Sequence, residues 1–445
     1  MLFDHLLLLA LVAAAGVGIA LWLLFLRYPK FGYICLFLSI VAGQLARISL
    51  GTDERGGAAI IVTDIVVLFI GSAWIMHKLI YERQLTKTPF SMPILVFCVV
   101  ALLSYLVGLV NLLNIDSLNL KSAIVSFSYW FRFAAYALLY FITAEFVQKS
   151  KSRLNFLLKL ILWTSILVSI GGFIQLVIMP DFTAYAIQYG WDPHQDRLLG
   201  TFFDPNFIGT YFAMIMALAI SIYPTSSKHI KALIVFSVLF CSVALLLTFS
   251  RTGYIAFIAA FLLIGILRSP KMLLIGAICI TLGVVASPRA VQRITDGLSV
   301  DETGLKRVYS WDKGTRILNN FPILGVGYNN LATVQDFYAL VDEFDVNNRG
   351  GLENTLLTIF VTTGITGGLA YIWLWWVFLS ASFKAWYRKK LFNSADRDLG
   401  LGIASAFIAL LVSSMFMNSL LYPFLLVHIW ILAALIPSYD RALTY

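Results

Sequence analysis

Long apolar stretches return along almost the whole chain, and they constrain its fold more than any other feature. A helix needs about 20 mostly apolar residues to cross a bilayer, and lipid leaves the backbone few alternatives to a helix. Runs of this kind lie near 3–26, 31–50, 58–77, 92–110, 122–147, 155–178, 204–223, 231–249, 252–267, 272–287, 355–383, 402–418 and 424–438. They predict an all-α polytopic membrane protein with about 13 transmembrane helices, one more or one fewer.

Composition excludes a soluble globular protein, because 60% of the 445 residues are hydrophobic and only 12% are charged. The run near 3–26 has no basic flank before it and no small-residue cleavage site after it, so we expect a retained helix. No repeat or linker divides the sequence, which predicts one membrane-embedded domain over 1–445. The cysteines all lie in apolar runs, where packing is their expected role: Cys35, Cys98, Cys241 and Cys279.

The net charge of +9 reflects basic loops rather than a nucleic-acid partner. Of the 32 Lys and Arg residues, 19 lie in one set of loops and span ends, six in the alternate set, and seven within 288–353. The positive-inside rule makes the first set cytoplasmic, together with the C-terminus. The two longest polar segments, 179–203 and 288–353, then face outward. Nucleotides are absent there, so a substrate must arrive already activated and carried by the membrane.

The first outward segment ends beside Asp204-Pro205, which predicts a helix start with a capping side chain and a proline at the first helical position. Arg197 lies just before it, at the membrane edge. Two interpretations stay open for Arg197. It can anchor the chain to lipid headgroups, or it can bind a phosphate of the substrate.

A tight outward turn between two spans, Thr248–Tyr254, contains Arg251. Either Ser250 or Thr248 can cap the helix that follows, so Arg251 lies where free backbone N–H groups already favour an anion. An arginine between apolar runs is costly unless it has a partner, and no acidic residue is nearby in sequence. A phosphate group is therefore the expected partner.

The long outward segment contains a predicted amphipathic helix over 303–319, with Leu305, Val308, Trp311 and Leu318 as its apolar markers. Arg307 and Trp311 are four residues apart and share a face. Arg316 is nine residues past Arg307, on the opposite side of a straight helix, so both can bind one phosphate only if the helix breaks, at Gly314 for example. Otherwise each arginine serves a different substrate, or the helix is simply a solvated surface element.

Glu353-Asn354 closes the long segment, where the chain returns to an apolar span. We expect both residues in the first turn of a helix at the outward membrane edge. A glutamate there often only complements the helix dipole. Its position on the same edge as Arg197 and Arg251 also suits a general base.

Several arginines and one carboxylate, with no convincing metal-ligand spacing, suit one kind of reaction. If the donor is a sugar on a lipid pyrophosphate, arginines can stabilise the charge that the leaving group gains. The carboxylate can take the proton from an attacking sugar hydroxyl. We therefore expect no metal and no cofactor.

In these segments the sequence resembles the O-antigen ligase/O-antigen polymerase superfamily of bacterial envelope glycosyltransferases. The resemblance rests on four places in order, over the C-terminal two-thirds of the chain: Arg197–Asn206, Ser250–Gly253, Arg307–Gly327 with its Pro322-Ile323-Leu324-Gly325-Val326-Gly327 ending, and Glu353-Asn354 followed by Gly364-Ile365-Thr366-Gly367. Arg316 and Gly327 fit an Arg-x10-Gly spacing described for polymerase loops, whereas Arg197 to Gly209 is one residue too long.

The resemblance implies a glycosyltransferase of the C type, in the bacterial inner membrane, with its active site on the outer face. Its substrates would be undecaprenyl-pyrophosphate-linked glycans, with Arg197 and Arg251 holding the donor pyrophosphate, and Arg307, Arg316 and Asn354 are further candidate binding residues. Ligases have a His-Asn pair where this chain has Glu353-Asn354. This departure favours a polymerase of repeat units, with Glu353 as the candidate base.

Three functions stay open. The leading one is a polymerase that transfers a growing glycan to a second lipid-linked repeat unit, for O-antigen, capsule or exopolysaccharide, with a chain-length regulator and a flippase as possible partners. The second is a ligase or O-oligosaccharyltransferase whose acceptor is lipid A-core or protein. The third is a flippase, which should carry its charges deep in several spans rather than at the outward ends.

Overall fold

The computed structural model describes residues 16–437 except positions 17, 50–58, 82–87, 115–119, 190–192, 272, 275, 277, 279–284, 286, 287, 297–301 and 338–350. Within this part of the chain, ten helices are long and apolar enough to cross a membrane. Each coincides with one of the predicted runs, so the predicted all-α polytopic class is confirmed. Two other predicted runs, 3–26 and 272–287, lie largely outside the described residues, and the run at 424–438 forms a helix of only 13 residues.

The elements follow one another in this order: α2 (Pro29–Ala42), η1 (Gly43–Ala46), β1 (Arg47–Ser49), β2 (Ala59–Ile61), α3 (Val62–Tyr81), α4 (Ser91–Asn114), α5 (Leu120–Gln148), α6 (Lys151–Ile178), α7 (Thr183–Tyr189), η2 (Gly200–Phe202), α8 (Pro205–Ile222), α9 (Lys228–Thr248), α10 (Arg251–Arg268), α12 (Pro288–Asp296), α13 (Glu302–Asn320), α14 (Leu331–Phe337), α15 (Thr355–Tyr387), α16 (Ser394–Ser414), η4 (Ser419–Leu421) and α17 (Pro423–Leu435). A short apolar helix, Gly18–Arg27, precedes them.

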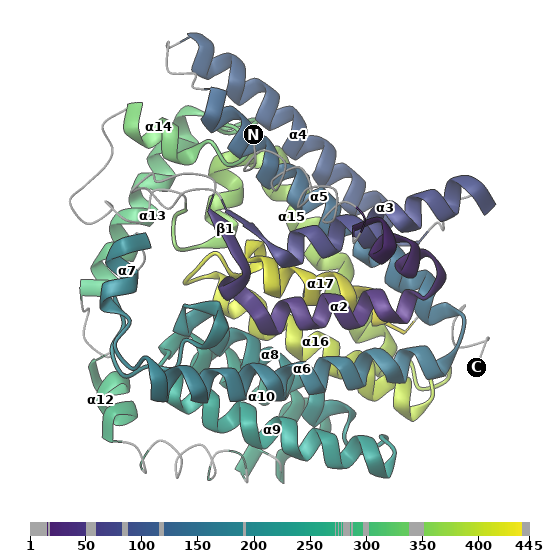
Figure 1. Cartoon of the computed structure of the whole chain (residues 1–445). Helices are drawn as coiled ribbons and strands as arrows, with labels where there is room; N and C mark the ends of the chain where they lie inside the picture. The colour runs from purple at the N-terminus through teal and green to yellow at the C-terminus, as the bar shows by residue number, and fades with distance from the viewer. Residues whose placement is uncertain are drawn as a thin grey trace, which may run out of the picture.

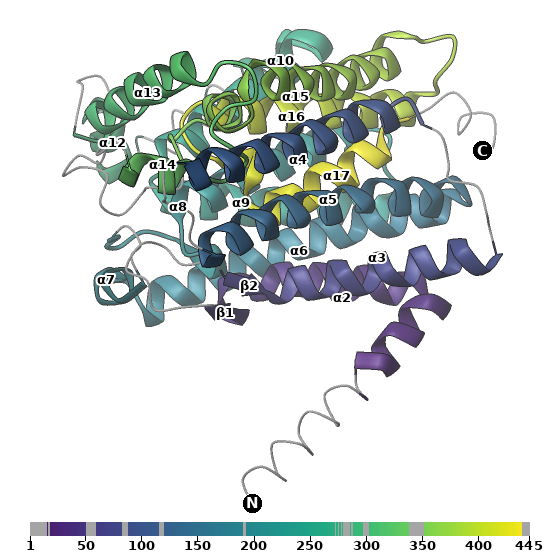
Figure 2. The same cartoon turned by 90° about the horizontal axis from the view of Figure 1, so that it is seen from above.

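The long apolar helices lie side by side in a bundle, and α8, α16 and the shorter α17 lie in its interior (Figures 1 and 2). Small residues let α8 approach its neighbours closely: alanines of α8 pack against alanines of α10 and α16. Gly209 of α8 also lies against Gly253 of α10, where an added Cβ on Gly253 would meet the Gly209 backbone at 3.1 Å. Close approach through small residues is the usual way in which membrane helices associate.

Helix α15 is interrupted at Gly364, and residues 322–327 of the long outward segment hydrogen-bond to its backbone there. Gly364 has φ 69° and ψ −174°, which breaks the helical hydrogen-bond ladder. The Val326 amide donates to the Val361 carbonyl at 3.0 Å, and the Ile365 amide donates to the Pro322 carbonyl at 2.8 Å. Irregular backbone is tolerated at membrane depth only where protein groups satisfy it, as they do here. The glycine-rich segment 322–327 thus attaches the outward loop to α15.

Helix α13 confirms the helix predicted over 303–319 and runs without a break through Gly314. An added Cβ at Gly314 would lie 2.5 Å from the Leu352 side chain, so glycine there allows α13 to pack close to the start of α15. The predicted apolar face was wrong in part, because Leu305 and Val308 are 48% and 56% exposed. The face that packs on α15 instead contains Gly314 and the buried Ile317.

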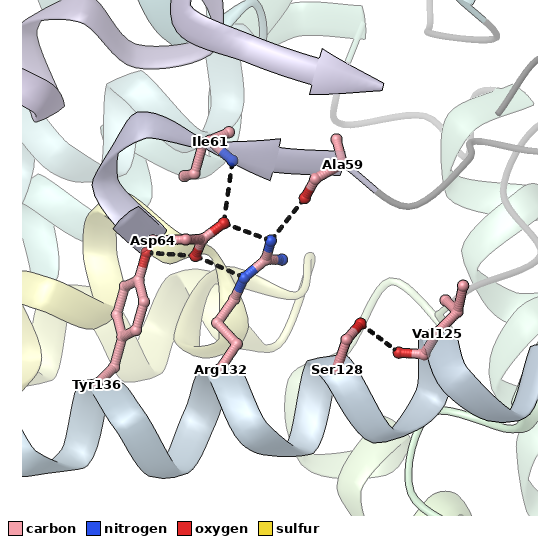
Figure 3. A network of polar contacts seen from close by, with 7 residues as sticks. All are labelled: Ala59, Ile61, Asp64, Val125, Ser128, Arg132 and Tyr136. Carbon is pink, nitrogen blue, oxygen red and sulfur yellow. Dashed lines mark hydrogen bonds and ion pairs between the residues drawn. The ribbon is translucent and has the colours of Figure 1, made fainter. Parts of the chain in front are cut away.

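A two-stranded antiparallel sheet, β1 with β2, lies next to a buried polar network (Figure 3). The carboxylate of Asp64 at the start of α3 accepts hydrogen bonds from Arg132 Nε at 2.8 Å and Nη2 at 2.7 Å, and from the Tyr136 hydroxyl at 2.9 Å. The Ile61 amide donates to the same carboxylate at 3.0 Å, and Arg132 Nη2 also donates to the Ala59 carbonyl at 2.7 Å. This network fastens β2 to α5.

The loop elements gather at one end of the bundle: β1, β2, α7, α12, α13 and α14 (Figure 2). The turns that join α5 to α6 and α15 to α16 lie at the opposite end. This separation agrees with the predicted division of the loops into two sets. Which end faces the cytoplasm remains a prediction.

Candidate functional site

The turn before α10 is built as the sequence predicts. The Ser250 hydroxyl accepts a hydrogen bond from the Gly253 amide at 3.1 Å and so caps α10. It also donates to the side-chain carbonyl of Asn206 at 2.7 Å, which joins this turn to the first turn of α8. Helix α8 begins with the expected cap, because the Asp204 carboxylate accepts from the Asn206 amide at 2.7 Å and the Phe207 amide at 2.9 Å.

Arg197 lies beside the same turn, although its contacts in the structure are with protein. Its Nε donates to the Thr248 carbonyl at 2.9 Å, and its Nη2 donates to the Phe249 carbonyl at 3.3 Å. These carbonyls belong to the end of α9, where backbone acceptors lack helical partners. Arg197 therefore fixes the turn that carries Arg251, the half-buried first residue of α10.

Arg289 of α12 is a third arginine at this turn, and sequence reasoning did not select it. It donates to the Gln195 carbonyl at 2.7 Å and the Asp196 carbonyl at 3.0 Å. Its guanidinium carbon lies 4.9 Å from the centroid of the Phe249 ring. Its position at the start of the basic loop was the available signal, but only the fold brings it to this turn. We call Arg197, Arg251 and Arg289 the arginine cluster.

Asp204, the cap of α8, lies within electrostatic reach of Arg197. Burial raises the pKa of its carboxyl, whereas the amides of Phe207 and Asn206 and the charge of Arg197 act in the opposite direction. Burial is the largest of these effects, so the pKa of Asp204 is raised overall while the carboxyl caps α8.

The second part of the site is the contact between α13 and the start of α15. Arg307 Nε lies 3.2 Å from Oε2 of Glu353. The Arg307 guanidinium carbon is 5.7 Å from the centroid of the Phe416 ring. The two side chains are 19% and 30% exposed, so the ion pair is sheltered but accessible. Arg307 and Trp311 lie one turn apart on the continuous helix α13, and both are half-buried.

Glu353 is not in the first turn of α15, which corrects the sequence-based placement. The cap is Asn354, whose side-chain oxygen accepts from the Leu357 amide at 3.0 Å. Glu353 precedes it with φ 49°, a left-handed conformation that is uncommon outside glycine. Asparagine is among the best capping residues, so it takes the cap and leaves the carboxylate outside the helix, directed to Arg307.

Helix α8 links the two parts. Its Asn206 contacts the arginine cluster's turn, and Thr210, one helical turn later, donates to the Met417 sulfur at 3.8 Å. The Met417 carbonyl in turn accepts from the Thr355 hydroxyl at 3.0 Å, next to Asn354. The arginine cluster and the Arg307–Glu353 pair therefore flank the same end of α8.

Arg316 is not brought to either part. Its side chain is 73% exposed, and it pairs with Asp312 at 2.6 Å, one turn back on α13. The unbroken helix keeps it away from Arg307, as the spacing requires. Among the described residues, no group of three or more His, Cys, Asp or Glu side chains could hold a metal ion.

Comparison with known families identifies one region. The model of the O-antigen ligase family matches residues 236–372, a region that contains Arg251, Arg307, Glu353 and Asn354 but not Arg197. The resemblance to the O-antigen ligase/polymerase superfamily is confirmed for this region, and it indicates a membrane glycosyltransferase-like enzyme. The match does not distinguish a polymerase from a ligase. A search of curated proteins finds no match.

Proposed function

We propose that this protein is a polymerase of undecaprenyl-pyrophosphate-linked repeat units, acting as one membrane-embedded domain in the bacterial inner membrane. It transfers a growing glycan from one lipid pyrophosphate to a sugar hydroxyl of a second lipid-linked repeat unit. Undecaprenyl pyrophosphate is the leaving group, and no metal is required. The observation that carries the proposal is the Arg307–Glu353 pair at 3.2 Å, beside the capped start of α15 and within the region that matches the family.

The arginine cluster suits the donor. As the glycosidic bond to the pyrophosphate breaks, negative charge grows on the leaving oxygens. Guanidinium groups stabilise that charge and can contact two oxygens at once. Arg251 stands at the start of α10, where the helix dipole adds to the attraction, while Arg197 and Arg289 hold the turn. The lipid tail can lie against the apolar faces of the spans.

Glu353 suits the acceptor. Its carboxylate takes the proton from the attacking hydroxyl while that oxygen forms the new bond to the anomeric carbon of the donor sugar. Arg307 orients the carboxylate before the acceptor enters. A base must lie within hydrogen-bond reach of the proton it removes, and the partial exposure of Glu353 allows a sugar to approach.

The decisive experiment is reconstitution of the purified protein with a single lipid-linked repeat unit and analysis of the products by gel. A ladder of oligomers without any other acceptor supports the polymerase. If products form only after lipid A-core or a protein acceptor is added, the protein is a ligase or O-oligosaccharyltransferase. Movement of the substrate between leaflets without new glycosidic bonds would instead indicate a flippase.

Arg251→Ala should weaken donor use strongly, seen as a raised KM for the lipid-linked repeat. Arg251→Lys should also be impaired if the contact is bidentate, because lysine cannot reproduce the two parallel donors. Lys228→Ala is a suitable control, since this lysine begins α9 at the other end of the bundle. An unchanged KM in both Arg251 variants would remove Arg251 from the donor site.

A further inference from the structure

A cavity of about 120 Å³ lies at the end of the bundle opposite the Arg307–Glu353 pair, between the helix Gly18–Arg27, α2, α3, α5 and the start of α6. Its apolar wall includes Phe25, Leu26, Ile70 and Ile142. Its polar rim contains His77, Glu145, Lys149 and Arg153. The proposed transfer reaction uses none of these residues, and the family match does not include them.

The charges at the rim favour an anion. The only acidic residue that lines the cavity, among those the structure describes, is Glu145, and it is already neutralised by an ion pair with Lys78 at 2.6 Å. Glu145 also accepts a hydrogen bond from the Trp74 indole at 2.9 Å. Lys149 and Arg153 therefore leave a surplus of two positive charges along the lining.

Arg153 is held at the rim rather than extended into solvent. Its guanidinium carbon lies 4.9 Å from the centroid of the Phe146 ring. Phe146 itself lines the cavity. The cavity thus has a cation next to an apolar wall. Such a site is complementary to an amphipathic ligand with an anionic head.

The surroundings place this rim at a membrane surface. Tyr28 and Tyr81 are exposed near it, and Leu79 and Ile80 are exposed on α3. Tyrosine belts mark the headgroup level of membrane proteins, and exposed aliphatic side chains next to them face acyl chains. The volume is far below the roughly 300–1,000 Å³ of pockets that enclose drug-sized ligands, so the cavity can take only part of a lipid, such as its phosphate and the first carbons of one acyl chain.

We propose that this cavity binds an anionic phospholipid, with the lipid phosphate between Lys149 and Arg153 and the start of an acyl chain against Phe25, Leu26, Ile70 and Ile142. Basic pockets between helices at a membrane surface are suited to such headgroups. The site is separate from the candidate glycosyltransferase site and does not depend on the proposed reaction.

The test is lipid binding to the purified full-length protein in detergent, by native mass spectrometry and thermal shift. The probes are short-chain phosphatidylglycerol, short-chain phosphatidylcholine and inorganic phosphate. The wild type should bind phosphatidylglycerol selectively and gain thermal stability from it. Each of the two basic residues that line the cavity should contribute about 1 kcal/mol to binding of the anionic headgroup, so Lys149→Gln with Arg153→Gln should weaken binding roughly 30-fold.

Lys151→Gln is the matched control, because Lys151 is an exposed basic residue between the two that does not line the cavity. It should bind the lipid nearly as well as the wild type. Equal binding by the double variant and the wild type would overturn the proposal, as would equal affinity for phosphatidylcholine. Stabilisation by inorganic phosphate alone, at the same affinity, would assign the site to a soluble anion and overturn the lipid.

Discussion

Two arginine–carboxylate pairs lie toward the same end of the bundle and differ in how tightly they are held. In the Arg132–Asp64 pair, two guanidinium nitrogens contact the carboxylate at 2.8 and 2.7 Å. The Tyr136 hydroxyl and the Ile61 amide donate two further hydrogen bonds to the Asp64 carboxylate (Figure 3). In the Arg307–Glu353 pair the ion contact is 3.2 Å, and the carboxylate side chain is 30% exposed against 12% for Asp64.

From this difference we expect a structural role for the Arg132–Asp64 pair and a reactive role for the Arg307–Glu353 pair. A buried carboxylate that accepts four hydrogen bonds has no capacity left for a substrate, and its removal leaves a charge without compensation. An accessible carboxylate with a longer ion contact can instead accept a hydrogen bond from a substrate hydroxyl without unfolding of the protein. The left-handed backbone of Glu353 points the same way, since such conformations are often found at functional positions.

The sharpest test of this comparison is Glu353→Gln. If the carboxylate is the base, glycan transfer should fall by about 10²–10⁴-fold, because that is the usual contribution of general base catalysis. The melting temperature should stay close to that of the wild type. The measurement is the initial rate of polymer formation with a lipid-linked repeat unit, together with thermal unfolding in detergent.

The control is Asp312→Asn, which also removes an acidic charge from an arginine pair at this end of the bundle, but from an exposed one. It should retain its transfer rate. A polymer ladder of normal rate and length from Glu353→Gln would remove the base assignment and make the two pairs alike.

Asp64→Ala should have the opposite profile. Removing one partner of a buried ion pair usually costs about 3–5 kcal/mol, because the remaining charge is left uncompensated. The melting temperature should therefore drop markedly, with activity lost only in proportion to the folded fraction. Asp64→Leu combined with Arg132→Met should recover part of the stability. A stable Asp64→Ala protein with no transfer activity would instead place Asp64 in the reaction.

Asn354→Ala tests whether the cap matters to the neighbouring carboxylate. Loss of an N-cap costs about 1 kcal/mol, and here it should also loosen Glu353 and reduce turnover several-fold. Asn393→Ala is a matched control, since Asn393 caps α16 by accepting from the Asp396 amide at 2.9 Å. It should lose similar stability but no activity. Equal turnover in the two variants would show that the cap does not position Glu353.

The sequence was sufficient to predict the class of fold, because apolar runs of membrane length have few alternatives. It also located the cap Asp204 and narrowed the cap of α10 to Ser250 or Thr248, because such caps are local signals; the structure selects Ser250. Three features depend on tertiary contacts that local spacing does not encode. They are the insertion of segment 322–327 into α15, the approach of Arg289 to Phe249, and the orientation of α13.

The placement of Glu353 shows the same limit on a smaller scale. A glutamate followed by an asparagine can begin a helix at either residue, and dipole complementation favours an acidic side chain in the first turn. The capping preference of asparagine prevails, and α13 supplies a cation for the displaced carboxylate. The sequence identified both Arg307 and Glu353, but it could not show that they contact each other.

Arg316→Ala should have the smallest effect on stability and on the transfer rate. It therefore serves as a reference for the effect of removing Arg307. Arg316 and Asp312 form an exposed pair one turn apart, which contributes about 0.3–0.5 kcal/mol in a helix. Stability and transfer rate should both remain near wild type, whereas Arg307→Ala should slow transfer about ten- to a hundredfold through the loss of Glu353 orientation. If Arg316→Ala instead lowers the transfer rate as much as Arg307→Ala, each arginine serves its own substrate, and α13 presents both of its faces to the reaction.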